Sequence, residues 1–192
     1  MSSRLLLASS SPQRRAILEG LGVAFEVAVP EIEELSDGEP GPLVLENALR
    51  KARSVAARAA GGRIVLGVDT VVSLDGRVFG KPRDAAEAEG YLRELSGRTH
   101  DVHSGLALVG PDGEHSHEAL TRVRFRNLSQ ADLDWYVTGG EWRERAGGYA
   151  IQGRGAALVE RIEGDYLNVV GLPAALLVRL LAEKFPGTYR FG

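Results

Sequence analysis

Hydroxyl and guanidinium side chains gather directly after the first apolar run of the chain. Residues 5–8 are apolar and of strand length, three serines and a proline follow at 9–12, and Arg14 and Arg15 begin a helical pattern. Backbone N–H groups at a helix start attract negative charge, and a guanidinium group can donate two hydrogen bonds to one phosphate. The stretch has the layout of an anion-binding turn, although a serine-capped turn with solvated arginines has the same sequence.

A carboxylate, a lysine and a glycine-rich segment follow later in the chain. Asp69 comes directly after an apolar strand predicted at 64–68, and the strand ends of α/β sheets are where ligands gather. Lys81 stands between a glycine and a proline, and Gln152 lies in a glycine-rich segment at 147–153. Each feature is a weak indication alone. Together they suggest a polyphosphate held by cations beside a carboxylate that binds a divalent ion or polarises a water.

Hydrophobic periodicity and turn residues predict a mixed α/β chain. Helices are predicted at 14–21, 43–60, 84–95, 129–138 and 174–184, and strands at 5–8, 25–29, 64–68, 71–74, 77–79, 99–109, 114–125 and 156–162. The acidic segment 30–42 is predicted to be a loop with mostly solvated carboxylates, one or two of which could reach a metal. The two long strands should form much of a second lobe. No repeat or linker divides the chain, so we expect one domain over residues 1–192.

Composition excludes several classes of protein. The 23 Lys and Arg residues do not outnumber the 26 Asp and Glu, and the net charge is −3, so nothing suggests a nucleic-acid partner. The absence of cysteine excludes disulfides and thiolate catalysis. No apolar run approaches the ~20 residues that span a bilayer, and the first residues do not resemble a signal peptide. We therefore expect a cytoplasmic protein without a membrane partner.

Four histidines, at 100, 103, 115 and 117, have spacings that invite a metal interpretation. His115 and His117 flank a predicted hairpin tip and alternate residues of a strand point to one face, so we expect them on an exposed face. We therefore do not predict a histidine metal site.

The successive motifs of the chain resemble those of the Maf family. They are Leu7–Pro12 followed by Arg14 and Arg15, Gly67–Val72, Gly80–Pro82, Leu95–His100, Gly148–Gly153, Gly164–Tyr166 and Gly171–Pro173. This resemblance implies an α/β fold with an elongated, twisted mixed sheet and flanking helices, in two lobes around a central cleft, related to the inosine triphosphatases. It also implies a hydrolase, a nucleoside triphosphate pyrophosphatase that cleaves between the α- and β-phosphates with Mg²⁺ or Mn²⁺.

The resemblance implies roles for individual residues. Asp69 matches the family's proton acceptor, Lys81 matches the lysine of its Gly-Lys-Pro motif, and Glu34 matches an acidic residue on the metal side. The implied substrate-binding residues are Ser9, Ser11, Arg14, Arg15 and Lys51. Metal binding lowers the basicity of a carboxylate, so two versions stay open. Asp69 acts as base with the metal on Glu34 and the phosphates, or Asp69 is itself a ligand.

Three positions bear on the base of the nucleotide. Thr70 and Gln152 match the branch of the family that acts on dTTP and UTP, whereas Gln13 departs from the arginine that is usual there. Gln152 offers both a donor and an acceptor to a base edge. The resemblance thus suggests dTTP and UTP as substrates, a house-cleaning role toward non-canonical nucleotides, and a homodimer.

Two other functions remain open. A sugar-activating nucleotidyltransferase also joins a phosphate-binding turn to a Lys-Pro motif, but it requires a glycine-rich first loop, and this one is rich in serine. A nucleotide-binding regulator of cell division would bind its ligand in the cleft without turning it over.

Overall fold

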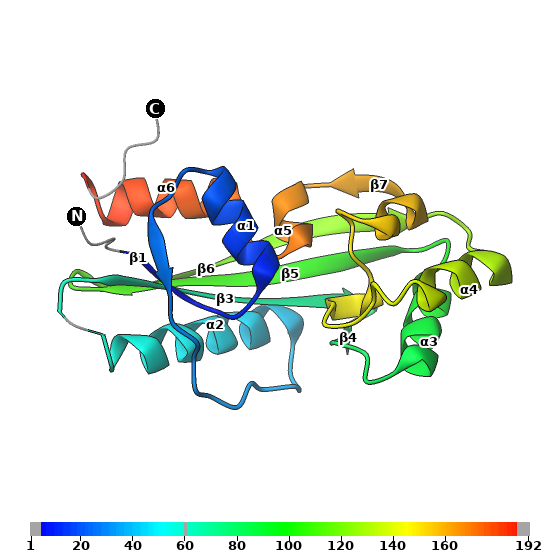
Figure 1. The fold of residues 1–192 in the computed structure, drawn as a ribbon, viewed down its shortest axis with the longest axis horizontal. Coiled ribbons are helices and arrows are strands. Elements are labelled where there is room, and N and C mark those ends of the chain that lie inside the picture. The colour runs from blue at the N-terminus through cyan, green and yellow to red at the C-terminus, as the bar shows by residue number, and fades with distance from the viewer. Residues whose placement is uncertain (1–4, 60, 188–192) are drawn as a thin grey trace.

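Within the described residues, 5–59 and 61–187, seven strands form one mixed sheet in this computed structural model (Figure 1). The order along the sheet is β2-β1-β3-β5-β6-β7, and β4 pairs with β3. β1 is parallel to β2 and β3, and the other pairs are antiparallel. The strands are β1 Leu5–Ala8, β2 Phe25–Val27, β3 Ile64–Leu74, β4 Arg77–Phe79, β5 Thr99–Gly110, β6 Gly113–Phe125 and β7 Val159–Glu163.

Helices cover both faces of this sheet. α2 lies along one face, and α1 and α6 lie on the opposite face (Figure 1). No helix in the described part of the chain has the length and apolar character needed to cross a membrane. The helices are α1 Pro12–Gly20, α2 Pro40–Ala56, α3 Ala85–Leu95, α4 Gln130–Thr138, α5 Tyr166–Val170 and α6 Ala174–Lys184, with 3₁₀ turns η1 Ala146–Gly148 and η2 Arg154–Leu158.

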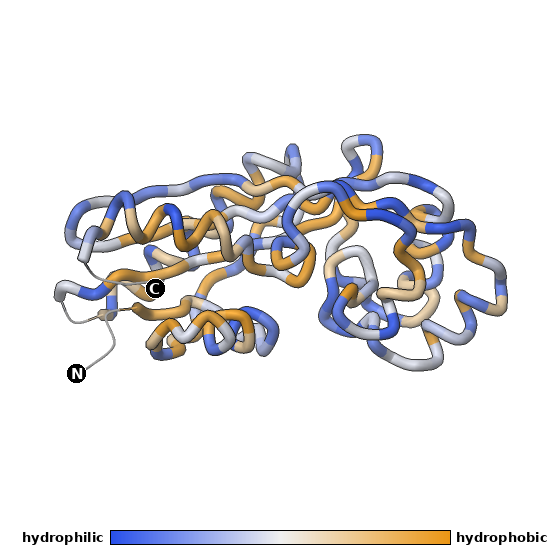
Figure 2. Tube along the Cα trace, turned by 90° about the horizontal axis from the view of Figure 1, so that it is seen from above, coloured by the Kyte–Doolittle hydropathy of each residue, from blue (hydrophilic) through white to orange (hydrophobic). Residues whose placement is uncertain are grey.

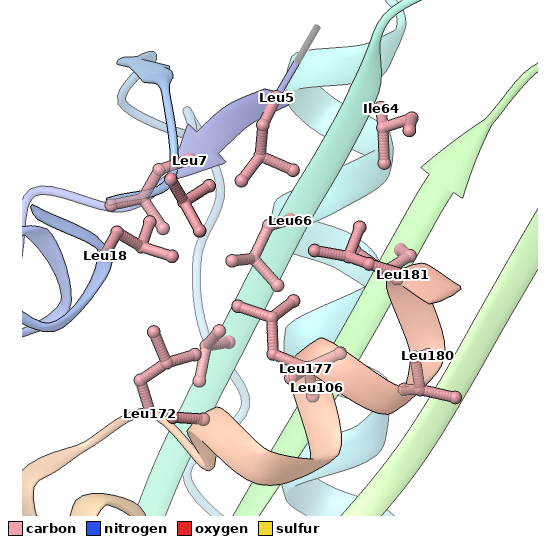
Figure 3. Close-up of a cluster of buried hydrophobic side chains, with 14 of the residues drawn as sticks. Leu5, Leu7, Leu18, Ile64, Leu66, Leu106, Leu172, Leu177, Leu180 and Leu181 are labelled. Carbon is pink, nitrogen blue, oxygen red and sulfur yellow. The ribbon is translucent and has the colours of Figure 1, made fainter. Parts of the chain in front are cut away.

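Separate cores build the two ends of the elongated molecule. At one end, leucines of β1, β3 and β5 pack against α1 and α6 (Figure 3), while alanines of α2 pack on the other face. At the other end, α3, α4 and the 3₁₀ turns enclose a second core around Phe125 and Tyr136. In Figure 2, hydrophobic stretches of the chain, coloured orange, occur in both halves of the molecule. The α/β fold predicted from the sequence, with its elongated sheet and flanking helices, is thereby confirmed.

The two long strands, predicted to form much of a second lobe, also extend into the first lobe. β5 pairs with β3 from Val65 opposite Val109 to Ser73 opposite Asp101, and it contributes Leu106 to the first core. The sheet therefore runs through both lobes and joins them. One domain over residues 1–192 stays a prediction, and its outermost residues, 1–4 and 188–192, lie outside the described ones.

Most predicted elements are present, with shifted boundaries. The helix predicted at 43–60 begins at Pro40 and ends at Ala56, and residue 60 lies outside the described residues. The last predicted strand begins later, at Val159, because the residues before it form η2. The short helix α5 was not predicted. The helix predicted from residue 129 begins at Gln130, with Ser129 as its N-cap. The Ser129 hydroxyl accepts from the Asp132 N–H, and the Asp132 carboxylate accepts from the Ser129 N–H.

Asp69 does not lie at a strand end, which corrects the sequence interpretation. The segments predicted as two strands, 64–68 and 71–74, are one strand, β3, with Asp69 in its middle. The strand continues because β5 pairs with it from Val65 to Ser73. Asp69 nevertheless lies where one edge of β3 has no partner strand. The pairing of β3 with β1 ends at Gly67, and its pairing with β4 begins at Val72.

Two glycines allow α2 to lie directly on the sheet. A Cβ on Gly67 of β3 would stand 2.1 Å from the carbonyl oxygen of Ala48, and a Cβ on Gly105 of β5 would stand 2.1 Å from that of Val44. These oxygens belong to the helix backbone, so α2 itself would have to move away from the strands. The close approach brings the α2 side chains to β3.

Replacement of Gly67 by alanine is expected to lower the free energy of unfolding by about 1–3 kcal/mol, because of overpacking between α2 and β3. Urea unfolding measures the change. Gly90→Ala is the matched control, since a Cβ at this position in α3 meets nothing within 4 Å. It should raise stability by up to about 1 kcal/mol through helix propensity. Equal stability of Gly67→Ala and the wild type would contradict the close approach.

A buried histidine links stability to pH. His100 is 1% exposed, and its Nε2 lies 2.9 Å from the Tyr149 hydroxyl. Burial lowers the pKa of His100 from 6.5 to about 4. Between these pH values the unfolded chain binds a proton that the folded chain does not, so stability falls as the pH falls. The expected slope is about 1.4 kcal/mol per pH unit.

His100→Gln is expected to flatten this slope, because glutamine can still bond to Tyr149 but does not titrate. Urea unfolding measured at intervals across the same pH window would detect the change. His117→Gln, at an exposed position of β6, should keep the wild-type slope. An unchanged slope in His100→Gln would assign the pH dependence to other groups.

Candidate active site

A cleft of about 920 Å³ opens between the two lobes, where the edge of β3 is free of β1 and β4. All but one of the site residues predicted from the sequence line this cleft. The lining ones are Ser9, Ser11, Gln13, Arg14, Glu34, Lys51, Asp69, Thr70, Lys81 and Gln152. The exception is Arg15, which is exposed on α1 outside the cleft lining, with Nη2 at 3.9 Å from Glu19 Oε1. The geometry therefore gives no support to the expected substrate-binding role of Arg15.

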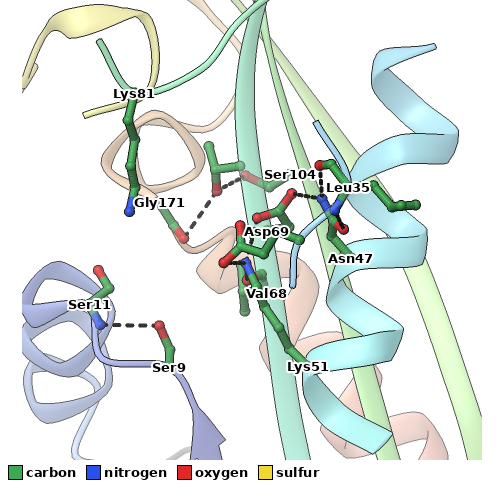
Figure 4. A network of polar contacts seen from close by, with 12 residues as sticks. Ser9, Ser11, Leu35, Asn47, Lys51, Val68, Asp69, Lys81, Ser104 and Gly171 are labelled. Atoms are coloured by element: carbon green, nitrogen blue, oxygen red, sulfur yellow. Dashed lines mark hydrogen bonds and ion pairs between the residues drawn. The ribbon is translucent and has the colours of Figure 1, made fainter. Parts of the chain in front are cut away.

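Asp69 is held from α2 by two side chains one helical turn apart (Figure 4). Lys51 Nζ donates to Asp69 Oδ1 over 2.6 Å, and Asn47 Nδ2 donates to Asp69 Oδ2 over 3.0 Å. All three side chains are buried, at 4%, 1% and 6% residue exposure for Lys51, Asn47 and Asp69. Both carboxylate oxygens are thus fixed by hydrogen bonds.

The electrostatics keep Asp69 ionised. Burial raises the pKa of this carboxyl, but the charge and hydrogen bond of Lys51 lower it, with help from Asn47 and the charge of Arg14. The pKa of Asp69 consequently lies below its usual value. A carboxylate held in this way accepts hydrogen bonds and cations readily, but it is a weak base for as long as Lys51 stays paired with it.

Lys51 also joins the acidic loop to the site. Its Nζ lies 3.0 Å from Glu34 Oε1, so carboxylates from the 30–39 loop and from β3 meet at one ammonium group. The Glu34 side chain is 53% exposed, in contrast to Asp69. The sequence expectation that most carboxylates of this loop are solvated agrees with its exposed residues, and Glu34 is the one that reaches Asp69 through Lys51.

Arg14 is positioned by groups from three elements. Its Nε donates to the Gly171 carbonyl over 2.9 Å, and Nη1 donates to Ser9 Oγ over 3.1 Å. Nη2 lies 3.4 Å from Thr70 Oγ1. Burial lowers the pKa of Arg14 while the charge of Asp69 opposes the shift, and a guanidinium remains charged regardless. A fixed positive group therefore faces the cleft at the start of α1.

Serine side chains shape the turn before α1. Ser9 Oγ accepts from the Ser11 N–H over 3.2 Å, and Ser11 caps α1 by accepting from the N–H of Arg14. Ser11 Oγ also donates to Gln13 Oε1 over 3.2 Å. The N-terminus of α1, with Pro12 at its first position, thus borders the cleft as the sequence predicted.

The opposite wall comes from the second lobe. Lys81 reaches into the cleft from above in Figure 4, and its Nζ donates to Glu144 Oε2 over 2.7 Å. Both partners are largely exposed, at 61% and 77% of the side chain. Gln152 is exposed and lines the same cleft. Lys51 on the β3 side is therefore buried and Arg14 is half-buried, whereas Lys81 on this side is largely exposed.

Sequence reasoning missed several residues that line the cleft. Asn47 is the one that the sequence could have indicated. Together with Lys51 it is a polar residue within the otherwise apolar buried face of α2, and buried polar side chains need partners. Other lining residues carry no pattern in the sequence that would have identified them. Polar and aromatic examples are Arg83, Glu87, Tyr91, Glu144 and Arg145.

Asp69 and Glu34 are the candidate carboxylate ligands for a divalent cation in this cleft. Oxygens of Asp69 and Glu34 both lie within 3.0 Å of the Lys51 ammonium, so the site already gathers carboxylate oxygens around one positive charge. Among residues 5–59 and 61–187, no group of three or more His, Asp or Glu side chains could hold a metal ion. Mg²⁺ takes about six oxygen ligands and retains waters, so phosphate oxygens and water would have to complete its shell.

Comparisons with known proteins identify the family. A family model described as Maf-like protein matches residues 4–184. A dTTP/UTP pyrophosphatase of Symbiobacterium thermophilum is 51% identical, over 94% of this chain and 93% of that protein. Proteins of the same name from Deinococcus radiodurans and Gloeobacter violaceus are 48% and 50% identical, over 98% and 95% of this chain and 96% and 97% of theirs.

A solved structure, of the Staphylococcus aureus Ham1 protein, aligns with a TM-score of 0.48 and 16% identity, over 63% of this chain and 71% of that chain. The family assignment does not depend on this weaker similarity, because the family model spans nearly the whole chain. The chain belongs to the Maf family.

Proposed function

We propose that this protein hydrolyses nucleoside triphosphates between the α- and β-phosphates, releasing a nucleoside monophosphate and pyrophosphate. The observation that carries the proposal is the meeting of Asp69, Lys51 and Glu34 with Arg14 in one cleft. The volume of about 920 Å³ is ample for a nucleotide. The names of the relatives make dTTP and UTP the substrates that we propose.

The cations of the cleft would neutralise the triphosphate. Arg14 is fixed and half-buried on one wall, whereas Lys81 is largely exposed on the other and can move to meet the phosphates. Both would stabilise the charge that develops on the departing pyrophosphate. Ser9 Oγ accepts hydrogen bonds from the Ser11 N–H and from Arg14, so its own hydroxyl proton can be donated to a phosphate oxygen. Ser11 can donate to a phosphate oxygen once it releases Gln13 Oε1.

Asp69 would accept the proton of the attacking water. The water oxygen attacks the α-phosphorus, the bond from this phosphorus to the bridging oxygen breaks, and that oxygen leaves with pyrophosphate. Phosphate oxygens that reach Lys51 compete with Asp69 for its ammonium. The arrival of substrate would therefore raise the pKa of Asp69 and make it a better base where the reaction takes place.

A Mg²⁺ or Mn²⁺ ion bound by Glu34 and the phosphates, with or without Asp69, would neutralise phosphate charge and lower the pKa of water. The two versions differ in the part played by Asp69. If it is a ligand, Asp69→Asn weakens Mn²⁺ binding in the presence of a non-cleavable nucleotide. If it is only the base, Mn²⁺ binding stays as in the wild type.

A screen of canonical and modified nucleoside triphosphates, with separate detection of pyrophosphate and orthophosphate, tests the function. We expect pyrophosphate as the product, with dTTP and UTP ranked first, in the presence of Mg²⁺ or Mn²⁺. Orthophosphate as the first product would overturn the proposed bond. Turnover of UTP only with a sugar phosphate would point to a nucleotidyltransferase, and binding without turnover would point to a nucleotide-binding regulator. Cleavage of modified nucleotides would support the house-cleaning role, which stays a prediction, as do the homodimer and the cytoplasmic location.

A further inference from the structure

Asn47 connects the two carboxylates of the site through the backbone of the acidic loop. Its Nδ2 donates to Asp69 Oδ2 over 3.0 Å and to the Leu35 carbonyl over 3.0 Å, and its Oδ1 accepts from the Leu35 N–H over 2.9 Å. Leu35 adjoins Glu34, whose carboxylate contacts Lys51. Figure 4 shows Asn47 between Asp69 and Leu35, and Lys51 beside Asp69. The contact of Glu34 with Lys51 closes the ring that runs from Asp69 through Asn47, the loop and Lys51 back to Asp69.

The amide of Asn47 has a single usable orientation. Its oxygen must face the N–H of Leu35 and its nitrogen must face the carbonyl of the same residue. The second N–H of this nitrogen then points to Asp69. Both donors and the acceptor of the amide are in use, and a flipped amide would lose all three hydrogen bonds. Asn47 is 1% exposed, so water does not replace them readily.

The loop depends on such contacts for its position. Residues 31 and 33–39 are exposed, and Leu35 itself is 39% exposed, so the loop has little apolar burial to hold it. Its first part is tied to α2 by the N–H of Glu31, which donates to Ser54 Oγ over 3.2 Å. Asn47 ties the later part, directly beside Glu34. Freed from this tie, the backbone and the long Glu34 side chain would sample many conformations.

We propose that Asn47 is a positioning residue that holds Glu34 and Asp69 in one arrangement around Lys51 for the hydrolysis. The proposal rests on the proposed function, since it concerns turnover at that site. Asn47 has no N–H group left to donate to a phosphate, because both of its side-chain N–H groups donate to Asp69 and to the Leu35 carbonyl. Its effect should consequently appear in kcat and much less in nucleotide affinity.

Asn47→Leu, which keeps the approximate size and removes all three hydrogen bonds, tests the proposal. We expect kcat to fall roughly 10- to 100-fold, the usual effect of removing a partner that orients a ligating or reacting group. The Kd of a non-cleavable α,β-methylene nucleoside triphosphate should stay within about threefold of the wild type, as expected for an interaction that matters in the transition state. Hydrogen exchange at the Leu35 amide should become faster. Asn47→Asp, which keeps the acceptor for the Leu35 N–H but replaces the donor to Asp69 and to the Leu35 carbonyl by a second carboxylate, should also lose kcat. Circular dichroism of each variant shows whether it is folded.

Ser54→Ala is the matched control, because it releases the first part of the same loop without touching Glu34 or Asp69. It should keep the wild-type kcat. Wild-type kcat in folded Asn47→Leu overturns the inference, and so does an equal loss of kcat in Ser54→Ala. A wild-type protein that cleaves no nucleoside triphosphate overturns the proposed function itself, which is a different result from active wild type with equally active Asn47 variants.

Discussion

Asp69→Asn is expected to reduce kcat by roughly 10²- to 10⁴-fold and to leave nucleotide binding intact. The amide has nearly the same shape, but it cannot accept the proton of water and carries no charge for a metal. Because Asp69 is an ionised carboxylate that repels phosphates, its neutral replacement should bind a non-cleavable nucleotide as tightly as the wild type or more tightly. Pyrophosphate release measures turnover, and calorimetric titration measures binding.

Asp101→Asn is the control for this substitution. Asp101 lies on the neighbouring strand β5, 3.7 Å from Arg122 and 40% exposed, outside the residues that line the cleft. Its replacement should change neither turnover nor binding. Turnover by Asp69→Asn within about tenfold of the wild type would remove Asp69 from the chemistry and leave charge neutralisation as the main contribution of the cleft.

Lys51→Met and Lys81→Met are expected to separate stability from function. Lys51 is buried against Asp69, so its loss leaves a buried carboxylate without its cation, at a cost of about 3–5 kcal/mol. For a chain of this size the melting temperature should fall by roughly 6–20 °C. Lys81 and Glu144 are exposed, so Lys81→Met should leave the melting temperature nearly unchanged. Both variants should bind nucleotide more weakly, because each removes a cation from the cleft.

The double variant Lys51→Met with Asp69→Asn tests the cause of this instability. Removal of the unpaired charge should restore much of the melting temperature lost in Lys51→Met, so that the two substitutions are strongly non-additive. Additive losses would show that Lys51 stabilises the protein through its packing on α2 and not through its pairing with Asp69. Circular dichroism during heating provides the measurement.

Local sequence patterns predicted much of the fold. The last helix, Ala174–Lys184, has the predicted bounds. The helices predicted at 84–95 and 129–138 start at Asp84 and Ser129, which are the N-caps of α3 and α4, since capping depends on residues only three positions apart. Strand continuity was harder to predict. Asp69 and Thr70 interrupt the apolar pattern, but β3 continues through them because β5 pairs with it, and that pairing joins residues far apart in the chain.

The composition of the site was accessible in part, and its arrangement was not. Arg14 and Arg15 are adjacent in sequence and equally basic, yet the structure directs Arg14 to Ser9 and Gly171 and leaves Arg15 outside the cleft. Adjacent residues of a helix point about 100° apart, so only one of the two can face a given wall. Which one does so depends on how α1 packs against the sheet.

The sequence by itself determined which charged and hydroxyl groups this protein has available, and the local turns, strands and helices that carry them. Only the tertiary structure decided which of these groups meet. Asp69 contacts Lys51 and Asn47 because Gly67 and Gly105 let α2 lie against β3 and β5, at a distance that any larger side chain would prevent. The two glycines thus fix the geometry of the acidic site. Because the interior is closely packed, the lack of a side chain at these positions determines how near α2 lies to the sheet.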